Sequence, residues 1–546
     1  MKGKITRNNR IVAAFLAVIM VISCMAMVHP FTVLAESSSL ATTASDNAGG
    51  NNYGLNTATT VKSYLYQDGD NLIRVEYVNS EVIVETYSMD LELLETKKLA
   101  LELPLWGGFY AGEDANYIIC GQNNFDEDDS VEVIRVIKYD KDFNRINSVG
   151  LYGANTIRPF NVGSLRCAEY GGYLYIRTSH QLYTSSDGLN HQANMTFSVR
   201  ESDMTITDSF YDVSNVGIGY VAHSFNQFIL IDSRENIVAF DHGDAYPRSA
   251  VLIKYRDLAG NETFVGRCDY VEIREFPGET GDNATGATLG GLAETSTGYI
   301  TVFSDNLKGT GRDQRNVYLS YTPKDNFTEE ATVVTKLTDY TGTDYTDFTA
   351  SNPMVVSTGL DGGYVLWNDA IVSGATPASN TLYYATYAAD GSVSDVKSVE
   401  GVWLSDCQPI CVDGKVIWYT TNSDYASGTP VFYTLDENGV SEKAYAPITN
   451  FQLNMDSYAG VTGEKIQIQS QVTPSGMYED LVAWSSSNEQ VASVAQDGTV
   501  TLNTEGNAII TACFNHDETW TRQVKITVRN CDDLEITSMP TKTSYY

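Results

Sequence analysis

Short apolar and aromatic runs recur along the chain and are separated by turns rich in Asp, Asn and Gly. Residues 363–367 (GYVLW), 382–387 (LYYATY) and 431–435 (VFYTL) are typical of these runs. Runs of about four to eight residues that are rich in β-branched and aromatic side chains predict strands. Helical periodicity is scarce. The pattern therefore predicts an all-β protein.

One turn of this pattern recurs with an acidic residue and marks a repeat. The acids lie 46 to 68 residues apart and are Asp90, Asp142, Asp203, Asp257, Asp325, Asp390 and Asp436. A period of about 50 residues with four strand-like runs per unit is typical of β-propeller blades. We therefore expect a β-propeller of about seven blades over residues 58–446, with Trp367 and Trp418 at equivalent positions between blades. An array of β-sandwiches is the alternative.

Residues 447–530 have a different pattern. Short alternating strands follow one another, with turn signals at intervals of about 8–12 residues. Trp484 lies near the middle of the segment, and Val524, Ile526 and Val528 alternate in its last strand. These features predict a small immunoglobulin-like β-sandwich built from two sheets.

The motifs of this segment resemble those of bacterial immunoglobulin-like domains of group 2. They are Trp-Ser-Ser-Ser-Asn (484–488), Val-Ala-x-Val (491–494), Asp-Gly-x-Val (497–500) and Gly-x-Ala-x-Ile-Thr-Ala (506–512). The resemblance implies a surface spacer or adhesion module, and the family offers no catalytic motif to transfer. Cys513 departs from the family's pattern, which usually has a polar residue there. Residues 531–546 resemble the opening strand of another bacterial immunoglobulin-like group, so a further module is expected to start there.

The N-terminal segment predicts export. Four basic residues precede position 11, residues 11–28 are almost wholly apolar, and 33–35 (VLA) suits a signal peptidase. We therefore expect a signal peptide at 1–35 and a flexible linker at 36–57. A lipobox-like stretch leaves lipidation of Cys24 as the alternative. No later run reaches the roughly 20 apolar residues that span a bilayer. We expect a secreted or cell-surface protein with no transmembrane segment in the mature chain.

The charge balance narrows the class of partner. The chain has 35 basic and 69 acidic residues, which gives a formal net charge of −34. Such a surface repels nucleic acid and anionic lipid, which leaves neutral glycans, cations or proteins as partners. Association with the cell wall fits the appended surface module. The seven cysteines beyond residue 35 contain no Cys-x-x-Cys pair, so no disulfide framework, zinc site or other cofactor is expected.

Four of the six histidines fall within residues 178–248, in strings that are unusually polar for strand-forming sequence. Unpaired polar groups inside strands cost about 1–3 kcal/mol each, so the cluster suggests a channel or a ligand pocket. The candidate ligand-binding residues are His180, His191, Asn194, His223, Asn226, Gln227, Asp241, His242, Asp244 and Arg248. A hydrogen-bonded network that lines the channel is one alternative, and catalysis or metal binding is another.

Motifs of common enzyme classes are absent from the sequence. It contains no Gly-x-Ser-x-Gly, no His-Glu-x-x-His and no phosphate-binding loop, so we nominate no catalytic residue and no metal ligand. We therefore expect binding of an extracellular ligand, with carbohydrate as the first candidate, rather than catalysis. The runner-up is a secreted glycan hydrolase or lyase, whose pair of carboxylates cannot be chosen among 69 acids. A structural surface component is the third class.

Overall fold

The computed structural model describes residue 47 and residues 58–78, 80–210, 226–255, 268–282, 285–306, 315–341, 348–371, 381–423, 426–444, 450–473, 482–514 and 520–530. Contacts between Cα atoms divide the chain into two compact units, of which one is Ala44–Tyr445 and the other includes Ala446–Tyr546. The expected signal peptide, residues 531–546 and all of the expected linker except Asn47 lie outside the described residues.

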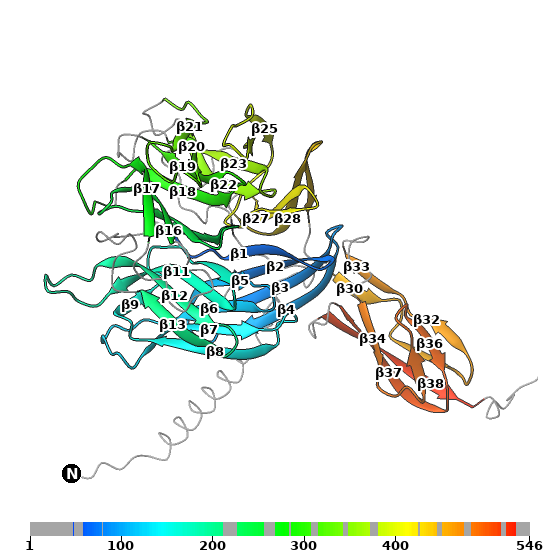
Figure 1. The fold of residues 1–546 in the computed structure, drawn as a ribbon. Coiled ribbons are helices and arrows are strands. Elements are labelled where there is room, and N and C mark those ends of the chain that lie inside the picture. Colours follow the sequence, from blue (N-terminus) through cyan, green and yellow to red (C-terminus); the bar gives the residue numbers. More distant parts are fainter. Residues whose placement is uncertain are drawn as a thin grey trace, which may run out of the picture. The chain divides into compact units, whose positions relative to one another are not determined.

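Within the described part of the first unit, the strands form seven consecutive antiparallel sheets, each a meander of four strands (Figure 1). Sheets one to three contain β1 (Ser63–Asp68), β2 (Asn71–Val78), β3 (Glu81–Ser88) and β4 (Leu93–Ala100); β5 (Leu105–Ala111), β6 (Asn116–Gly121), β7 (Glu132–Tyr139) and β8 (Arg145–Tyr152); and β10 (Arg166–Tyr170), β11 (Tyr173–Leu182), β12 (Gln192–Arg200) and β13 (Thr205–Phe210), with β9 (Thr156–Pro159) beside β11. Sheets four to seven contain β14 (Phe228–Ile231), β15 (Ile237–His242), β16 (Ser249–Tyr255) and β17 (Cys268–Glu275); β18 (Ala287–Glu294), β19 (Gly298–Asp305), β20 (Asn316–Pro323) and β21 (Val333–Lys336); β22 (Phe348–Ser357), β23 (Gly362–Ile371), β24 (Thr381–Ala388) and β25 (Lys397–Glu400); and β26 (Ile410–Val412), β27 (Lys415–Ser423), β28 (Ala426–Asp436) and β29 (Gly439–Ala444). These sheets are the blades of a β-propeller, so the predicted fold is confirmed.

Six of the seven acidic turns of the sequence repeat lie in the described residues, where they connect the third strand of a blade to its fourth; Asp257 lies outside the described residues. The described acids that end or follow a third strand are Asp90, Asp142, Asp203, Asp325, Asp390 and Asp436. Asp390 Oδ1 accepts a hydrogen bond from the backbone N–H of Ser392 (3.0 Å), and Asp436 Oδ1 accepts one from that of Asn438 (2.7 Å). Because a short carboxylate can satisfy the N–H two residues later, acids recur at this turn.

The first strands of the blades pack against one another around the centre of the propeller. β10 packs against β5 and β14, β18 packs against β14 and β22, and β26 packs against β22 and β1. Trp367 in β23 and Trp418 in β27 are fully buried and stack on Tyr383 and Tyr433 of the neighbouring third strands. Trp367 packs with side chains of the fifth blade and Trp418 with side chains of the sixth. The two tryptophans are therefore equivalent contacts between blades, as expected.

In the described residues, each blade is built from its own consecutive strands, so no strand is shared between the first blade and the seventh. Contacts of side chains join these two blades instead. The backbone N–H of Lys62 donates to Asp406 Oδ2 (2.8 Å), and Tyr419 OH donates to Glu76 Oε2 (3.1 Å). Arg74 is fully buried, pairs with Glu76 and lies 4.9 Å from the centre of the Tyr419 ring. A buried charged cluster thus helps to close the ring of blades.

The described residues of the second unit form a small sandwich. Its strands are β31 (Ser457–Val461), β38 (Thr521–Arg529), β37 (Gly506–Phe514) and β34 (Val482–Ser486) in one sheet; β32 (Lys465–Gln467), β36 (Thr499–Leu502) and β35 (Ala492–Val494) in another; and the pair β30 (Asn450–Leu453) and β33 (Ser470–Thr473). Val500, Ile510 and Val524 are fully buried in its core, and Trp484 packs against them. This is the β-sandwich that the alternating pattern predicted. In the described part of the chain, no helix is long and apolar enough to cross a membrane.

Candidate functional site

Two cavities lie among the first strands of the blades. The first cavity, of about 310 Å³, is lined by Val61, Ser63, Tyr64, Leu65, Tyr66, Phe109, Tyr110, Ala111, Leu165, Arg166, Cys167, Gln408 and Ile410. The second cavity, of about 350 Å³, is lined by Arg166, Phe228, Gly291, Leu292, Val355, Val356, Ser357, Gln408, Pro409, Ile410 and Cys411. Arg166, Gln408 and Ile410 line both, so the two cavities are neighbours at the centre of the propeller.

Aromatic side chains of the first two blades form one side of the first cavity. We call Tyr64, Tyr66 and Phe109 the aromatic wall; the ring of Phe109 lies 5.5 Å from that of Tyr64 and 5.6 Å from that of Tyr66. Gly108 in β5 permits this close packing. A Cβ atom there would lie 2.9 Å from Tyr64 Oη and 3.0 Å from the Leu165 side chain. The missing side chain thus lets the aromatic wall form.

Arg166, the first residue of β10, brings a positive charge to both cavities. Its Nη1 donates to the Leu165 carbonyl (3.2 Å), and its guanidinium lies 5.1 Å from the centre of the Phe228 ring. Among the described residues, no carboxylate forms an ion pair with it, and the Asp406 carboxyl acts on its charge only from a longer distance. Burial lowers the pKa of Arg166, yet a guanidinium keeps its charge at neutral pH.

Asp406 lies just before β26 and is only 4 % exposed. Its Oδ2 accepts the hydrogen bond from the backbone N–H of Lys62 (2.8 Å) that helps to close the ring of blades. Burial raises the pKa of this carboxyl from 3.8 to about 7, because a low-polarity environment disfavours the charged form. Asp406 therefore changes its charge in the physiological pH range.

The three described histidines of the predicted site have different side-chain partners. His180 is buried in β11, and its Nδ1 lies 2.7 Å from Thr156 Oγ1. His242 is buried at the end of β15, and its Nε2 lies 2.7 Å from Thr285 Oγ1. His191 follows β11, and its side chain is 40 % exposed. Each of the three imidazoles therefore has a different environment.

Asn194 and Asp241 meet at the boundary between the third and fourth blades. Arg177 in β11 donates from Nε to Asp241 Oδ1 (2.9 Å), and Asn194 donates from Nδ2 to Asp241 Oδ2 (2.7 Å). All three side chains are buried. A buried carboxylate that is bound by a guanidinium and an amide has its charge compensated, so this network stabilises the packing of two blades.

Three of the remaining predicted residues, Asn226, Gln227 and Arg248, donate to backbone carbonyls. Asn226 donates from Nδ2 to the Leu289 carbonyl (2.9 Å), and Gln227 donates from Nε2 to the Ser164 carbonyl (3.1 Å). Arg248 donates to three carbonyls, those of Asp244, Pro277 and Asp282. These contacts fix the segments around β14 and after β15 against their neighbours.

The structure thus gathers part of the predicted ligand site. Contacts join Asn194 to Asp241 and Arg248 to the Asp244 carbonyl, whereas the described histidines bind different partners. His223 lies outside the described residues. Ligand binding at this cluster stays a prediction. In the residues that the structure describes, no group of three His, Cys, Asp or Glu side chains is placed to hold a metal ion.

Arg166 and the aromatic wall were not among the residues expected from the sequence. Their common feature is a position on, or directly beside, the first strand of a blade. The repeat period fixes the number of blades, but it does not show which of four strands is innermost. Once that strand is known, an arginine in the short first strand of the third blade becomes a candidate.

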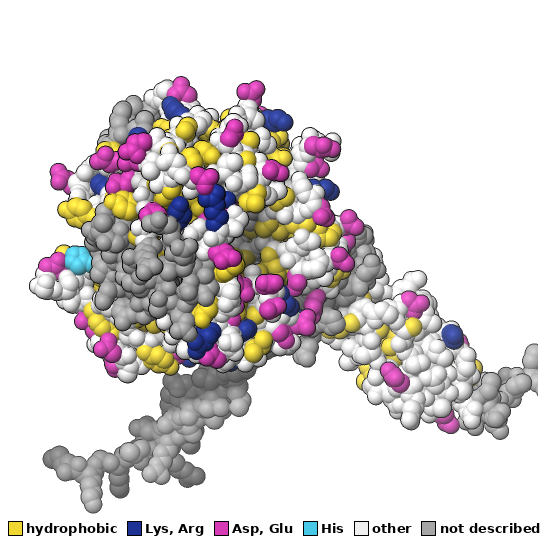
Figure 2. All heavy atoms as spheres, in the orientation of Figure 1, with side chains coloured by type: hydrophobic (Ala, Val, Ile, Leu, Met, Phe, Trp, Pro, Cys, Tyr) yellow, Lys and Arg dark blue, Asp and Glu magenta, His cyan; other side chains and the backbone are white. Residues whose placement is uncertain are grey.

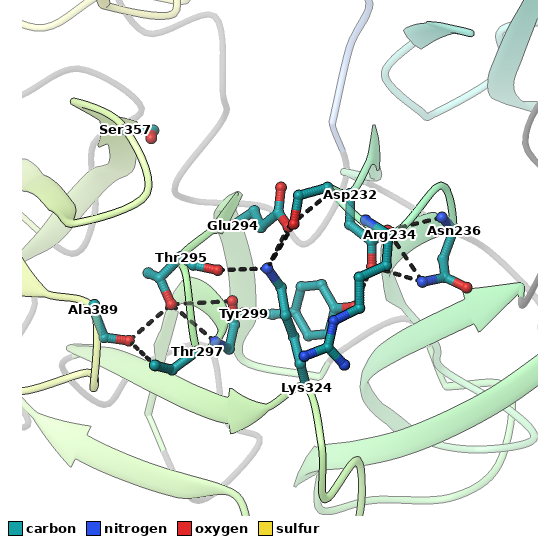
Figure 3. A network of polar contacts seen from close by, with 12 residues as sticks. Asp232, Arg234, Asn236, Glu294, Thr295, Thr297, Tyr299, Lys324, Ser357 and Ala389 are labelled. Atoms are coloured by element: carbon teal, nitrogen blue, oxygen red, sulfur yellow. Dashed lines mark hydrogen bonds and ion pairs between the residues drawn. The ribbon is translucent and has the colours of Figure 1, made fainter. Parts of the chain in front are cut away.

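A further polar cluster joins the fourth, fifth and sixth blades (Figure 3). Lys324, just after β20, pairs with Glu294 and donates to the Thr295 carbonyl (2.6 Å). Thr295 Oγ1 donates to the carbonyl of Ala389, which follows β24 (2.7 Å). Because these donors and acceptors satisfy one another, we assign the cluster to packing between blades rather than to ligand binding.

The C-terminal unit matches a known domain family. Residues 447–524 match the bacterial Ig-like domain (group 2), so this segment is a domain of that family and the resemblance of its motifs is confirmed. The match covers a small part of the chain and does not assign the propeller to a family. A comparison with curated proteins finds no match.

The propeller is similar to solved structures at low identity. BamB from Moraxella catarrhalis is 10% identical, with a TM-score of 0.38 over 82% of this chain and 98% of that one. The WD40 domain of coronin from Toxoplasma gondii is 7% identical, with a TM-score of 0.36 over 73% and 87%. The α-L-arabinanase of Cellvibrio cellulosa is 8% identical, with a TM-score of 0.29 over 65% and 92%.

Proposed function

We propose that this chain is an exported bacterial protein that binds an extracellular glycan at the centre of its propeller. The observation that carries the proposal is the aromatic wall of the first cavity. The C–H faces of sugar rings are apolar and their edges carry hydroxyl groups, so a pocket with aromatic walls and a few polar groups suits them. Gln408 and Arg166 supply the polar groups here.

Two features of the chain support export. The N-terminal segment combines basic residues with a long apolar run, which is the pattern of a signal peptide. Bacterial Ig-like domains of group 2 resemble surface spacers, and residues 447–524 are such a domain. In this proposal, signal peptidase cleaves after Ala35, and the Ig-like domain holds the propeller at the cell surface or wall.

The charge of the chain favours some glycans over others. Acidic side chains are spread over the face of the molecule in Figure 2 more widely than basic ones, in keeping with the formal net charge of −34. A surface of this sign repels polyanions over long distances. The expected ligand is therefore neutral or carries little charge, and an extracellular protein is the alternative partner.

The proposal is tested by exposing the purified full chain to plant, host and bacterial polysaccharides and measuring its retention. We expect at least one glycan to be retained, and we expect Tyr66→Leu to weaken binding by about tenfold because a stacking ring is lost. Tyr152→Leu removes a 57 % exposed ring that lines neither cavity and is the matched control. No retention on any polymer, or equal losses in the two variants, would contradict the proposal.

The cluster predicted from the sequence is a rival position for the same ligand. If His223→Ala combined with His242→Ala abolishes retention while Tyr66→Leu does not, the ligand binds there instead. Circular dichroism of each variant shows whether a loss of retention comes from unfolding.

A glycan-cleaving enzyme is the second candidate, and a pair of carboxylates favours it. Tyr117 OH donates to Glu201 Oε1 (2.9 Å), and burial together with the charge of Glu169 raises the pKa of Glu201 well above that of an ordinary carboxyl. Burial and the charge of Glu169 also raise the pKa of Tyr110, which lines the first cavity. Glycoside cleavage uses one protonated and one ionised carboxyl group.

The same polysaccharide panel separates binding from cleavage. In the binding proposal, no new reducing or unsaturated ends appear in any polymer. Ends that appear with the wild-type chain and disappear with Glu201→Gln would move the enzyme into first place, with Glu201 as the proton donor.

A further inference from the structure

Resting on the proposed glycan binding, we propose that the ligand carries a carboxylate and that Arg166 binds it where the two cavities meet. The occupant is a glycan with an isolated acidic sugar, such as a uronate residue, in an otherwise neutral chain. Among the described residues that line either cavity, Arg166 is the one that carries a formal charge.

Arg166 differs from the arginines that hold the blades together. Arg74 and Arg177 have no exposed surface, and each forms ion pairs with buried carboxylates. Arg248 donates hydrogen bonds to three backbone carbonyls. A guanidinium has five N–H donors. In the described structure Arg166 uses one of them, toward the Leu165 carbonyl (3.2 Å). Most of its hydrogen-bonding capacity is therefore available to a ligand.

The surroundings of Arg166 make this spare capacity costly without a ligand. Apolar side chains dominate the second cavity, and the Phe228 ring lies 5.1 Å from the guanidinium. A charge that is moved from water into such a site loses solvation free energy unless it gains a partner of opposite charge. Replacement of Arg166 should therefore destabilise the packing of the blades less than replacement of Arg177, which forms a buried ion pair with Asp241.

A carboxylate is the group that fits a guanidinium best. The planar fork of N–H donors matches two carboxylate oxygens, and such charge-assisted pairs are shorter and stronger than neutral hydrogen bonds. The aromatic wall lies in the same cavity as Arg166, so one ligand can stack a sugar ring and place a carboxylate on the guanidinium. A sugar acid combines both groups in one molecule.

The acidic surface limits the number of charges on the ligand. A formal net charge of −34 opposes the approach of a polyanion. One carboxylate on a neutral glycan meets little of this repulsion and still gains the local pair with Arg166. The inference is therefore an acidic sugar in a neutral chain and not a polyuronate.

The test is calorimetry of the full chain with a set of uronate-containing oligosaccharides, each paired with its carboxyl-reduced twin. We expect at least one acidic oligosaccharide to bind about tenfold or more tightly than its twin. Arg166→Gln should remove this difference. Arg158→Gln is the matched control, because Arg158 is exposed, lies 5.2 Å from the Phe125 ring and lines neither cavity.

The outcomes separate the inference from the proposed function. Equal binding of acidic glycans and their twins, unchanged by Arg166→Gln, would overturn the inference and leave glycan binding intact. Failure of every acidic and neutral glycan to bind would overturn both. If Arg166→Gln does not fold, the comparison of each acid with its twin on the wild-type chain decides the question.

Discussion

Arg74, Arg177 and Arg166 all lie in strands of the propeller, in β2, β11 and β10, and they differ in what surrounds them. The first two are fully buried beside carboxylates. The third lies between two cavities and has one backbone hydrogen bond and one aromatic contact. An arginine side chain can therefore stabilise a contact between blades or be available to bind a ligand, and the neighbouring residues determine which.

Two glycines with the same backbone conformation provide a test at the residue scale. Gly391 and Gly414 both have φ of +78°, a conformation that L side chains rarely adopt. At Gly391 an added Cβ would lie 2.4 Å from Tyr321 Cβ, whereas at Gly414 nothing lies within 4 Å. We expect Gly414→Ala to lower the free energy of unfolding by about 1 kcal/mol and Gly391→Ala by about 2–4 kcal/mol.

Urea unfolding of the two variants measures this difference directly. Because the backbone cost is shared, the excess for Gly391→Ala reports the clash between the sixth and fifth blades. Equal losses in the two variants would show that the turn after β24 moves away from Tyr321 without cost.

At the scale of strands and blades, much of the fold could be predicted from the sequence. The acids Asp390 and Asp436 mark the turn between third and fourth strands, because the carboxylate of each satisfies a nearby N–H. Trp367 and Trp418 mark equivalent second strands. These are local signals, so they can be seen without the tertiary structure.

The site could be predicted far less well, because it depends on contacts between blades. Asp241 looks like a ligand-binding acid in the sequence, but its partner Arg177 is 64 residues away and becomes visible only when two blades pack. Arg166 was not predicted as a site residue, because nothing beside it in the sequence shows that the fold places it next to two cavities. The surroundings of both Asp241 and Arg166 thus come from residues that are distant along the chain.

The Arg177–Asp241 pair gives a prediction at the scale of neighbouring blades. Asp241→Asn leaves the buried charge of Arg177 without compensation, so we expect the free energy of unfolding to fall by about 3 kcal/mol or more. Adding Arg177→Met should recover part of the loss. Asp203→Asn breaks an exposed pair with Arg200 and should cost about 1 kcal/mol or less. Equal losses for Asp241→Asn and Asp203→Asn in chemical denaturation would contradict a structural role for Asp241.

At the scale of the whole molecule, closure of the ring of blades makes stability depend on pH. The pKa of Asp406 is about 7 in the folded chain against 3.8 for an ordinary aspartate. A raised pKa means that the folded state holds the proton more tightly, so the stability that this proton provides is complete below about pH 4. It is lost as the pH rises to about 7, at up to about 1.4 kcal/mol per pH unit.

Asp406→Asn tests this account of closure. The amide keeps an oxygen for the Lys62 N–H and does not titrate, so the melting temperature of the variant should change less between pH 5 and pH 8 than that of the wild type, by about 5 °C or more. Asp413→Asn replaces an exposed carboxylate in the turn between β26 and β27 and is the control. Identical pH profiles for the wild type and Asp406→Asn would contradict the role given to Asp406.

The central claim is that the propeller binds its ligand in the cavities between the first strands of the blades. Two free thiols report on them, since Cys167 lines the first cavity and Cys411 the second, while Cys513 belongs to the Ig-like domain. The decisive measurement is the rate of alkylation of each thiol by a small reagent, followed by mass spectrometry with and without a retained glycan. Burial raises the pKa of Cys167, so its reaction is slow and needs long time courses. We predict that the glycan slows alkylation of Cys167 or Cys411 and leaves Cys513 unchanged; unchanged rates at both cavity thiols with glycan bound would contradict the claim.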